Sequence, residues 1–221
     1  MKTQSLAETT IRLSADLELK GFLQGTERAD GLIVFVHGSG SSRFSVRNNQ
    51  VARFLRTRGF ATLLMDLLTP REDQIDAVTR ELRFNIPLLA RRVIGAVDWI
   101  AAHESISKLS VGLFGASTGA AAALIAAASR PALIKAVVSR GGRPDLAGDA
   151  LPAVHTPTLL IVGSDDVQVL HLNQTAVSRM PGDTQLVTIE GATHLFEEPG
   201  ALDEAARCAA DWFERCLRAR T

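Results

Sequence analysis

The feature that most constrains the fold of this chain is a regular alternation of short apolar runs with longer amphipathic segments. Apolar runs typical of strands buried on both faces occur at 31–36, 61–65, 109–114, 134–139, 158–162 and 185–189. Helical periodicity occurs between and after them, at 47–58, 85–102, 117–129, 170–180 and 201–218. Because parallel strands need crossover connections, this order predicts an α/β fold: a mostly parallel, twisted sheet with helices on both faces.

Two short alternating runs, at 9–13 and 17–23, precede this pattern and predict an antiparallel hairpin at the sheet edge, which makes about eight strands. No repeat, linker or shift in composition divides the chain, so residues 1–221 are expected to form one domain. Two stretches, 66–83 and 140–157, are expected to be irregular. Both follow strand ends, where ligands bind in open α/β sheets.

The charge balance narrows the class of partner. Lys plus Arg number 24 and Asp plus Glu also number 24, so no overall field favours nucleic acid or an anionic membrane surface. No apolar run is long enough to cross a bilayer, residues 1–10 lack the apolar region of a secretory signal, and there are only 2 cysteines. We therefore expect a cytoplasmic protein with a small-molecule substrate. The sequence does not define its oligomeric state.

The pentapeptide GASTG, at 115–119, stands between the apolar run VGLF and an alanine-rich helical segment. A GxSxG pattern between a strand and a helix is typical of a nucleophile elbow, a tight turn that exposes the serine hydroxyl above the sheet. Glycines suit the two outer positions because larger side chains would meet neighbouring backbone. The alternative is a helix-capping serine between small residues. The pattern favours Ser117 as a nucleophile.

A serine hydroxyl needs a general base and an acid that orients the base. The loop after the seventh predicted strand contains Asp165 and Asp166, and the loop after the eighth contains His194. Both loops should share the sheet edge with Ser117, and the chain order Ser, Asp, His is that of α/β-hydrolases. We predict Asp166 as the acid. Asp165, the alternative, would otherwise cap the next helix or face water.

The other histidines occupy positions that suggest no base. His37 ends the third predicted strand and is interpreted as structural, beside a glycine- and serine-rich loop. That loop can supply backbone donors to an oxyanion, and the N–H groups of Ser39 and Thr118 are the expected pair, with a residue adjacent to Ser39 as the alternative for the first donor. The remaining three, at 103, 155 and 171, are interpreted as surface or packing residues. No metal or organic cofactor is implied.

Arg140 and Arg143 follow the sixth predicted strand and are candidates for binding a substrate carboxylate. The alternative is that they form ion pairs with Asp145 or Asp149. Too few residues lie between the sixth and seventh predicted strands for a lid domain. An open site of this kind indicates a small or exposed acyl group rather than a long buried one.

The motifs HGSGSS, FGASTGAAAAL, VSRGGRPDLAG, LLIVGSDD and GATHLFEEPG resemble those of the α/β-hydrolase superfamily, and more narrowly small dienelactone-hydrolase-like proteins. The resemblance runs from Gly31 to the last predicted helix. It implies an α/β-hydrolase fold, and the family's GxxD motif and histidine map onto Asp166 and His194. Dienelactone hydrolases proper carry a cysteine at the elbow. Ser117 therefore indicates a serine variant, for which dienelactone is not the expected substrate.

Some relatives of this kind are fused to a phosphoribosyltransferase domain, which would suggest a partner protein, and no such domain is expected here. Two other classes of function compete with hydrolysis. A dinucleotide-binding oxidoreductase is disfavoured because the chain has 0 tyrosines and its glycine turn follows the fifth strand rather than the first. A non-catalytic binding module on a hydrolase fold stays open. The sequence favours a serine hydrolase that cleaves a small ester, thioester or lactone through an acyl-enzyme.

Overall fold

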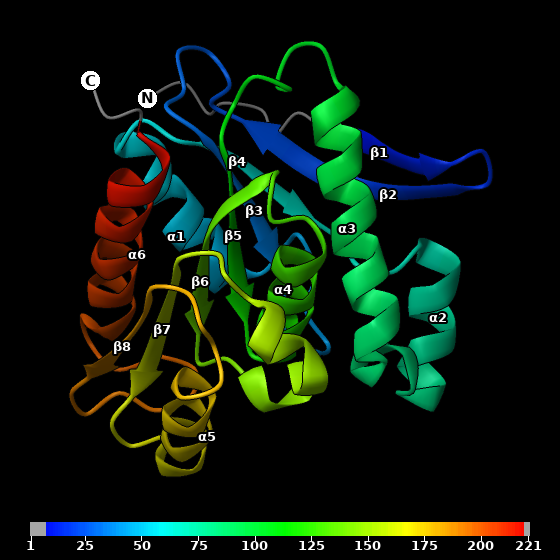
Figure 1. The fold of residues 1–221 in the computed structure, drawn as a ribbon. Coiled ribbons are helices and arrows are strands. Elements are labelled where there is room, and N and C mark those ends of the chain that lie inside the picture. Colours follow the sequence, from blue (N-terminus) through cyan, green and yellow to red (C-terminus); the bar gives the residue numbers. More distant parts are fainter. Residues whose placement is uncertain (1–7, 219–221) are drawn as a thin grey trace.

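A computed structural model describes residues 8–218, which form an eight-stranded sheet flanked by helices (Figure 1). The strands are β1 Glu8–Ser14, β2 Leu17–Gln24, β3 Leu32–Val36, β4 Ala61–Met65, β5 Val111–Ala116, β6 Ile134–Arg140, β7 Thr158–Gly163 and β8 Thr184–Ile189. The helices are α1 Val46–Thr57, α2 Pro70–Thr79, α3 Ile86–Ala102, α4 Thr118–Ser129, α5 Val167–Val177 and α6 Ala201–Leu217, with 3₁₀ segments η1 Leu82–Phe84 and η2 Pro144–Ala153.

The strand order across the sheet is β1-β2-β4-β3-β5-β6-β7-β8. The hairpin of β1 and β2 pairs antiparallel with β4, and every pairing from β4 to β8 is parallel. The α/β architecture with a mostly parallel sheet and an antiparallel edge is thus confirmed. Because the chain turns outward in both directions from β3, the ends of β3 and β5 lie at a point where strand order reverses, a common place for a ligand site.

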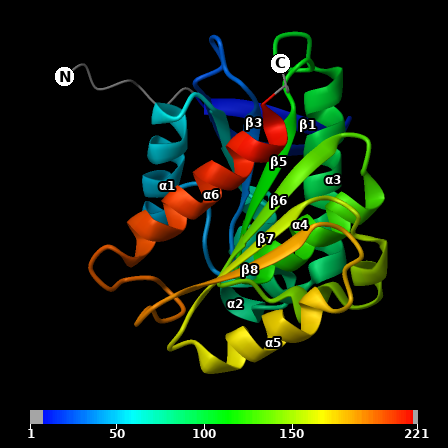
Figure 2. The same cartoon turned by 60° about the vertical axis from the view of Figure 1, so that its left-hand side comes forward.

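Helices cover both faces of the sheet, as Figure 2 shows from a second side. On one face α3 and α4 pack against the strands, with α5 over β7 and β8; on the other, α1 packs beside α6. Every residue of β3, β4, β5 and β7 is buried. This burial on both faces explains why these strands are continuous apolar runs rather than alternating ones.

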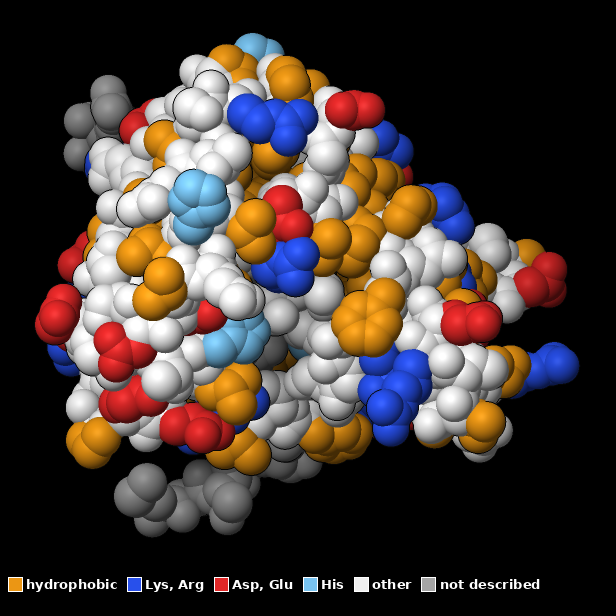
Figure 3. Space-filling view, turned by 90° about the horizontal axis from the view of Figure 1, so that it is seen from below, with side chains coloured by type: hydrophobic (Ala, Val, Ile, Leu, Met, Phe, Trp, Pro, Cys, Tyr) orange, Lys and Arg blue, Asp and Glu red, His pale blue; other side chains and the backbone are white. Residues whose placement is uncertain are grey.

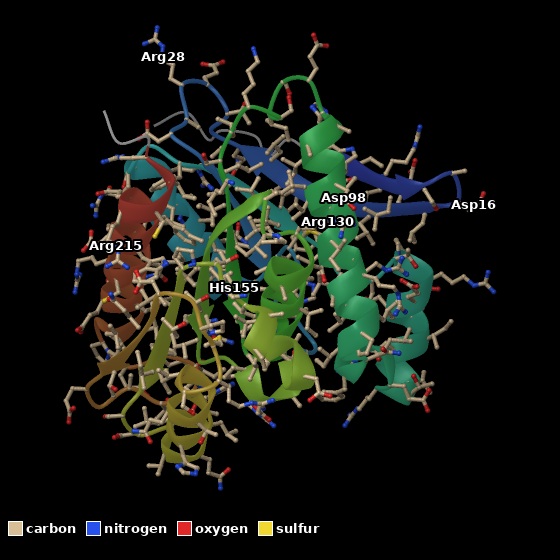
Figure 4. All side chains as sticks on the ribbon, in the orientation of Figure 1. Asp16, Arg28, Asp98, Arg130, His155 and Arg215 are labelled. Carbon is tan, nitrogen blue, oxygen red and sulfur yellow. The ribbon has the colours of Figure 1, made fainter. Side chains whose placement is uncertain are left out.

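Arg130, just after α4, donates two hydrogen bonds to Asp98 of α3, at 2.8 and 2.9 Å. Figure 4 labels this pair and also His155. His155 is exposed and precedes β7, so it lies at the opposite end of that strand from Gly163. The expectation that His155 is a surface residue agrees with this position. Within residues 8–218, no helix combines the length and the apolar character that crossing a membrane requires. Residues 1–7, used for the expected cytoplasmic location, lie outside the described residues.

The two stretches expected to be irregular contain helices. In the first, α2 begins after Thr69, whose Oγ1 accepts from the N–H of Glu72 at 3.2 Å while Glu72 Oε2 accepts from the N–H of Thr69 at 2.8 Å. This capping box, with Pro70 at the first helical position, is a start signal that the sequence contains as TPRE. In the second, η2 is interrupted at Gly148, where φ is 53°.

Candidate active site

Ser117 lies between β5 and α4 with φ 50° and ψ −123°, a backbone conformation that non-glycine residues rarely adopt. A Cβ at Gly115 would lie 2.5 Å from Ala120 Cα, and one at Gly119 would lie 2.3 Å from the carbonyl oxygen of Val36. Both glycines are therefore required for α4 to follow β5 so closely. The local geometry is that of the predicted elbow, with strain concentrated at the serine.

The loop after β6 holds the elbow in place. The backbone N–H of Ser117 donates to the carbonyl oxygen of Arg140 at 3.3 Å, and the N–H of Arg143 donates to the carbonyl oxygen of Ser117 at 3.1 Å. The same loop is fixed by Asn173 of α5, which is fully buried and donates from Nδ2 to the carbonyl oxygen of Gly142 at 2.9 Å. The strained turn is thus supported by the end of β6, by the loop that follows it and, through that loop, by α5.

His194, in the loop after β8, lies between the serine and an aspartate. Its Nε2 is 3.3 Å from Ser117 Oγ, and its Nδ1 is 2.6 Å from Asp166 Oδ2. Because a carboxylate only accepts hydrogen bonds, Nδ1 carries a proton and Nε2 is the acceptor that faces the serine hydroxyl. The side chain of His194 is 38% exposed and that of Asp166 is 13% exposed. The three predicted triad residues are therefore brought together in hydrogen-bonding order.

The two neighbouring aspartates have different surroundings. Asp166 occupies the N-cap position of α5 but makes no capping hydrogen bond with its side chain, which turns to His194 instead. Asp165 is exposed, and its Oδ1 accepts from the hydroxyl of Ser164 at 3.1 Å. Geometry thus separates two residues that the sequence left as alternatives.

His37 supports the loop opposite the triad. Its Nδ1 donates to the carbonyl oxygen of Gly38 at 2.9 Å, and its Nε2 accepts from the N–H of Leu67 at 3.2 Å. Desolvation by burial lowers the pKa of His37, although Gly38 and two nearby carboxylates oppose the shift. A neutral ring is the form that can accept from Leu67. This arrangement agrees with the structural role expected for His37.

The two backbone donors expected for an oxyanion hole differ in availability. Thr118 begins α4, so its N–H has no acceptor within the helix. The N–H of Ser39, in contrast, donates to Thr118 Oγ1 at 2.9 Å. The expectation of two free donors therefore needs one correction: the Ser39 amide is already engaged by the Thr118 hydroxyl.

The two arginines after β6 also differ. Arg143 forms a bidentate pair with Asp145, with nitrogen to oxygen distances of 2.8 and 2.7 Å, and does not line the cavity beside Ser117. The expectation that Arg143 binds a substrate is thus replaced by the ion-pair alternative. Arg140 does line that cavity and is 6% exposed. Hydrogen bonding to Asp145 raises the pKa of Arg143, whereas desolvation lowers the pKa of Arg140 to about 10.

The cavity beside the triad measures about 230 Å³. Because Ser117 follows β5 and His194 follows β8, the cavity lies at the carboxyl ends of the strands, the side of the molecule that Figure 3 shows and where that face is hollowed. Its lining residues are Gly38, Ser39, Ser41, Ser45, Arg47, Asn48, Ala116, Ser117, Arg140, His194 and Leu195. Sequence analysis missed Asn48, although one signal was present: a polar residue on the buried stripe of α1 that includes Val51 and Leu55.

A family model described as the dienelactone hydrolase family matches residues 19–219. The chain belongs to the dienelactone hydrolase family. The crystal structure of a dienelactone hydrolase from Anabaena variabilis has 51% sequence identity and a TM-score of 0.94, covering 96% of this chain and 98% of the other. The structure of Est1E from Butyrivibrio proteoclasticus with bound ferulic acid has 16% identity and a TM-score of 0.79, covers 96% of this chain and 100% of its own, and shows the fold alone.

Proteins from two strains of Mycobacterium tuberculosis, provisionally named phosphoribosyl transferases, are 53% identical to this dienelactone hydrolase family member over 201 residues. The match covers 91% of this chain and 44% of each relative. The chain therefore spans less than half the length of the curated relatives it matches. Together with the fold, these comparisons confirm a dienelactone-hydrolase-like α/β-hydrolase.

Proposed function

We propose that this protein is a serine hydrolase that cleaves a small ester, thioester or lactone through an acyl-enzyme. The observation that carries the proposal is the hydrogen-bonded chain from Ser117 Oγ to His194 to Asp166, at 3.3 and 2.6 Å. This is the arrangement in which a base activates a serine and a carboxylate fixes the tautomer of the base. Membership of the hydrolase family supports the same conclusion.

In the proposed reaction, Ser117 Oγ attacks the substrate carbonyl while His194 Nε2 accepts the hydroxyl proton. Asp166 stabilises the imidazolium that forms. The tetrahedral intermediate collapses when His194 returns the proton to the leaving oxygen or sulfur, which leaves the acyl group on the serine. His194 then removes a proton from water, and the water attacks the acyl carbon. The bond to Ser117 Oγ breaks as His194 returns the proton to Oγ, which releases the acid and restores the serine.

The oxyanion of the intermediate would be held by backbone donors. The N–H of Thr118 is at the start of α4, where the helix dipole also favours negative charge. The N–H of Ser39 can join it only if the oxyanion competes with Thr118 Oγ1, its present acceptor at 2.9 Å. We therefore propose both amides as donors, with the hydroxyl of Thr118 giving way as charge develops.

The cavity sets the size of the substrate. A volume of about 230 Å³ lies below the ~300–1,000 Å³ of pockets that hold drug-sized ligands. A short acyl group and a compact alcohol or thiol fit this space, whereas a long lipid chain does not. The half-exposed His194 indicates that water reaches the site, as the second step of the reaction requires.

Fluorophosphonate labelling followed by intact-mass measurement tests the proposal. An activated serine displaces fluoride and gains one phosphonyl adduct, so we expect a single adduct on the native protein and none on Ser117→Ala. His194→Ala should label at a rate lower by at least ~10³-fold. Absence of an adduct on folded native protein would favour the second candidate, a non-catalytic binding module on a hydrolase fold.

A further inference from the structure

Among residues 8–218, Arg140 is a buried charge without an ion-pair partner. Its side chain belongs to the last residue of β6 and is 6% exposed, yet its Nε has no hydrogen-bond partner. No carboxylate within residues 8–218 forms an ion pair with it, and the charge of Arg47, which lowers its pKa, has the same sign. The ring of Phe196 lies 5.4 Å from the guanidinium carbon and compensates only in part. Buried charges of this kind ordinarily have a counter-charge.

Asn48 is a second polar side chain in the same condition. It is 3% exposed, and its Oδ1 is buried without a hydrogen-bond partner. Both Asn48 and Arg140 line the cavity that contains Ser117 and His194. Two residues with an unpaired polar atom, one in α1 and one in β6, therefore line one space. Since buried polar groups in native proteins are normally satisfied, a missing anion accounts for the unpaired guanidinium, whereas Asn48 Oδ1 is an acceptor, so only the Nδ2 of Asn48 can donate to an anion.

The N-terminus of α1 contributes to the same wall. The helix has 12 residues and begins after Ser45, and Ser45 and Arg47 both line the cavity. A helix N-terminus carries about half a positive charge and unpaired N–H groups, which bind anions well. No aspartate or glutamate is among the residues that line the cavity. This end of the cavity is therefore positive and rich in donors.

We propose that Arg140, the side-chain Nδ2 of Asn48 and the N-terminus of α1 bind a phosphate monoester group carried by the substrate of Ser117. This inference deepens the proposed function, on which it rests, by naming a substrate class: small phosphorylated esters, thioesters or lactones. Arg140 is the specificity-determining residue, whereas the charge of Arg47, at the rim, is paired with Glu197 at 2.9 Å.

Charge and donor number favour phosphate over carboxylate. One buried guanidinium and the helix N-terminus supply about 1.5 positive charges, and a phosphate monoester carries about −1.5 to −2 at neutral pH. Its three terminal oxygens can accept hydrogen bonds from a guanidinium, an amide N–H and a helix N-terminus at the same time. A carboxylate has one charge and two oxygens, so it would leave part of this wall unpaired.

Binding to a catalytically inactive protein tests the inference apart from the proposed function. The probe is 2-acetoxyethyl phosphate, titrated calorimetrically into the whole chain carrying Ser117→Ala. We expect the additional change Arg140→Gln to weaken binding about ten- to a hundredfold, the usual loss for a charge-assisted hydrogen bond, and Arg140→Lys to weaken it less. Arg143→Gln is the matched control, because Arg143 pairs with Asp145 outside the cavity, and should bind as Ser117→Ala alone does.

The chemical class is tested with two analogues of the same shape. 3-Acetoxypropanoate replaces phosphate by carboxylate, and 2-methoxyethyl acetate is neutral. We expect binding to weaken in that order, and Arg140→Gln to leave the neutral ester within about twofold. Equal binding of the phosphate ester with and without Arg140 would overturn the inference, as would tighter binding of the carboxylate. Thermal unfolding of each variant establishes that it is folded.

The two proposals can fail independently. If the native protein takes no fluorophosphonate but Arg140 governs binding of the phosphate ester, the proposed hydrolysis fails and the anion site stands. If labelling succeeds but Arg140→Gln binds the phosphate ester as tightly as its parent, hydrolysis stands and the phosphate site is wrong. With Ser117 in place, Arg140→Gln should raise the KM for hydrolysis of 2-acetoxyethyl phosphate by about tenfold or more and change kcat less. Release of acetate measures both.

Discussion

The two ends of the cavity differ in how their polar groups are satisfied. At the triad end, both imidazole nitrogens of His194 have partners, at 3.3 and 2.6 Å. At the Arg140 end, the guanidinium Nε and Asn48 Oδ1 have none. The first end is organised by the protein alone, which suits a reaction centre that must be in place before the substrate arrives. The second end is incomplete, as expected of a site that a ligand completes.

The largest expected effect comes from a change at the triad carboxylate, at the end of the cavity that the protein organises alone. Asp166→Asn should lower kcat by about 10³–10⁴-fold, because the amide no longer holds the His194 tautomer or its charged form. Asp165→Asn, one residue away and exposed, should change kcat by less than about twofold. Ester hydrolysis followed in a pH-stat measures both. A larger loss with Asp165→Asn would mean that the acid has been assigned to the wrong residue.

At the Arg140 end of the cavity, substitution should change the stability of the ligand-free protein. Arg140→Met removes a buried, unpaired charge and keeps an apolar side chain against Phe196, so the free energy of unfolding should rise by about 1–3 kcal/mol. Urea denaturation measures the change. If Arg140 instead stabilises the fold, Arg140→Met should lower the free energy of unfolding. Arg143→Met, which breaks the exposed pair with Asp145, should cost less than about 1 kcal/mol.

His37, which supports the loop opposite the triad, should make the stability of the protein sensitive to acid. Its folded pKa lies below the usual 6.5, so between the two values the unfolded chain binds more protons and stability falls as pH falls. One proton gives a slope of up to about 1.4 kcal/mol per pH unit. Urea denaturation from pH 7.5 to 5.5 should show a shallower slope for His37→Gln. His155→Gln, at an exposed position, should keep the native slope, and equal slopes in both variants would contradict this role for His37.

The smallest expected effect concerns strain at the elbow. Ser117→Gly relieves a positive φ of 50° but adds backbone freedom to the unfolded chain, so the free energy of unfolding should rise by about 1 kcal/mol. Ser117→Ala keeps a Cβ and with it the strain, so its stability should stay within about 0.5 kcal/mol of native. Both variants lose the nucleophile. Equal stability of the two would show that the turn stores no strain.

Much of the fold could be predicted because buried parallel strands and their helices have distinct periods. The strand at 61–65 was predicted with the bounds of β4, and the hairpin, the helix after the elbow and the chain order of the triad were also anticipated. The segment that became α2 was missed. It has a weak amphipathic pattern, with only Asp76 buried, so its start signal rather than its periodicity would have identified it.

The site was predicted less completely than the fold, because partners depend on side-chain direction. Arg140 and Arg143 are three residues apart and looked equivalent in sequence. The structure extends β6 by one residue beyond the predicted end, which places Arg140 on the same face as Ala136 and Val138. Arg143 lies after the strand, beside Asp145. If the predicted strand had been extended by one residue, the sequence would have placed Arg140 on the buried face of that strand and Arg143 outside it.

The position of His194 after β8 has a consequence for inactivation by heat. Among residues 8–218, β8 pairs only with β7 and most of its residues are partly exposed, so local opening should release this strand before the central ones. The serine and the aspartate follow β5 and β7, deeper in the sheet. On warming, the imidazole would leave the site while most backbone amides remain protected from hydrogen exchange, and activity would return on cooling.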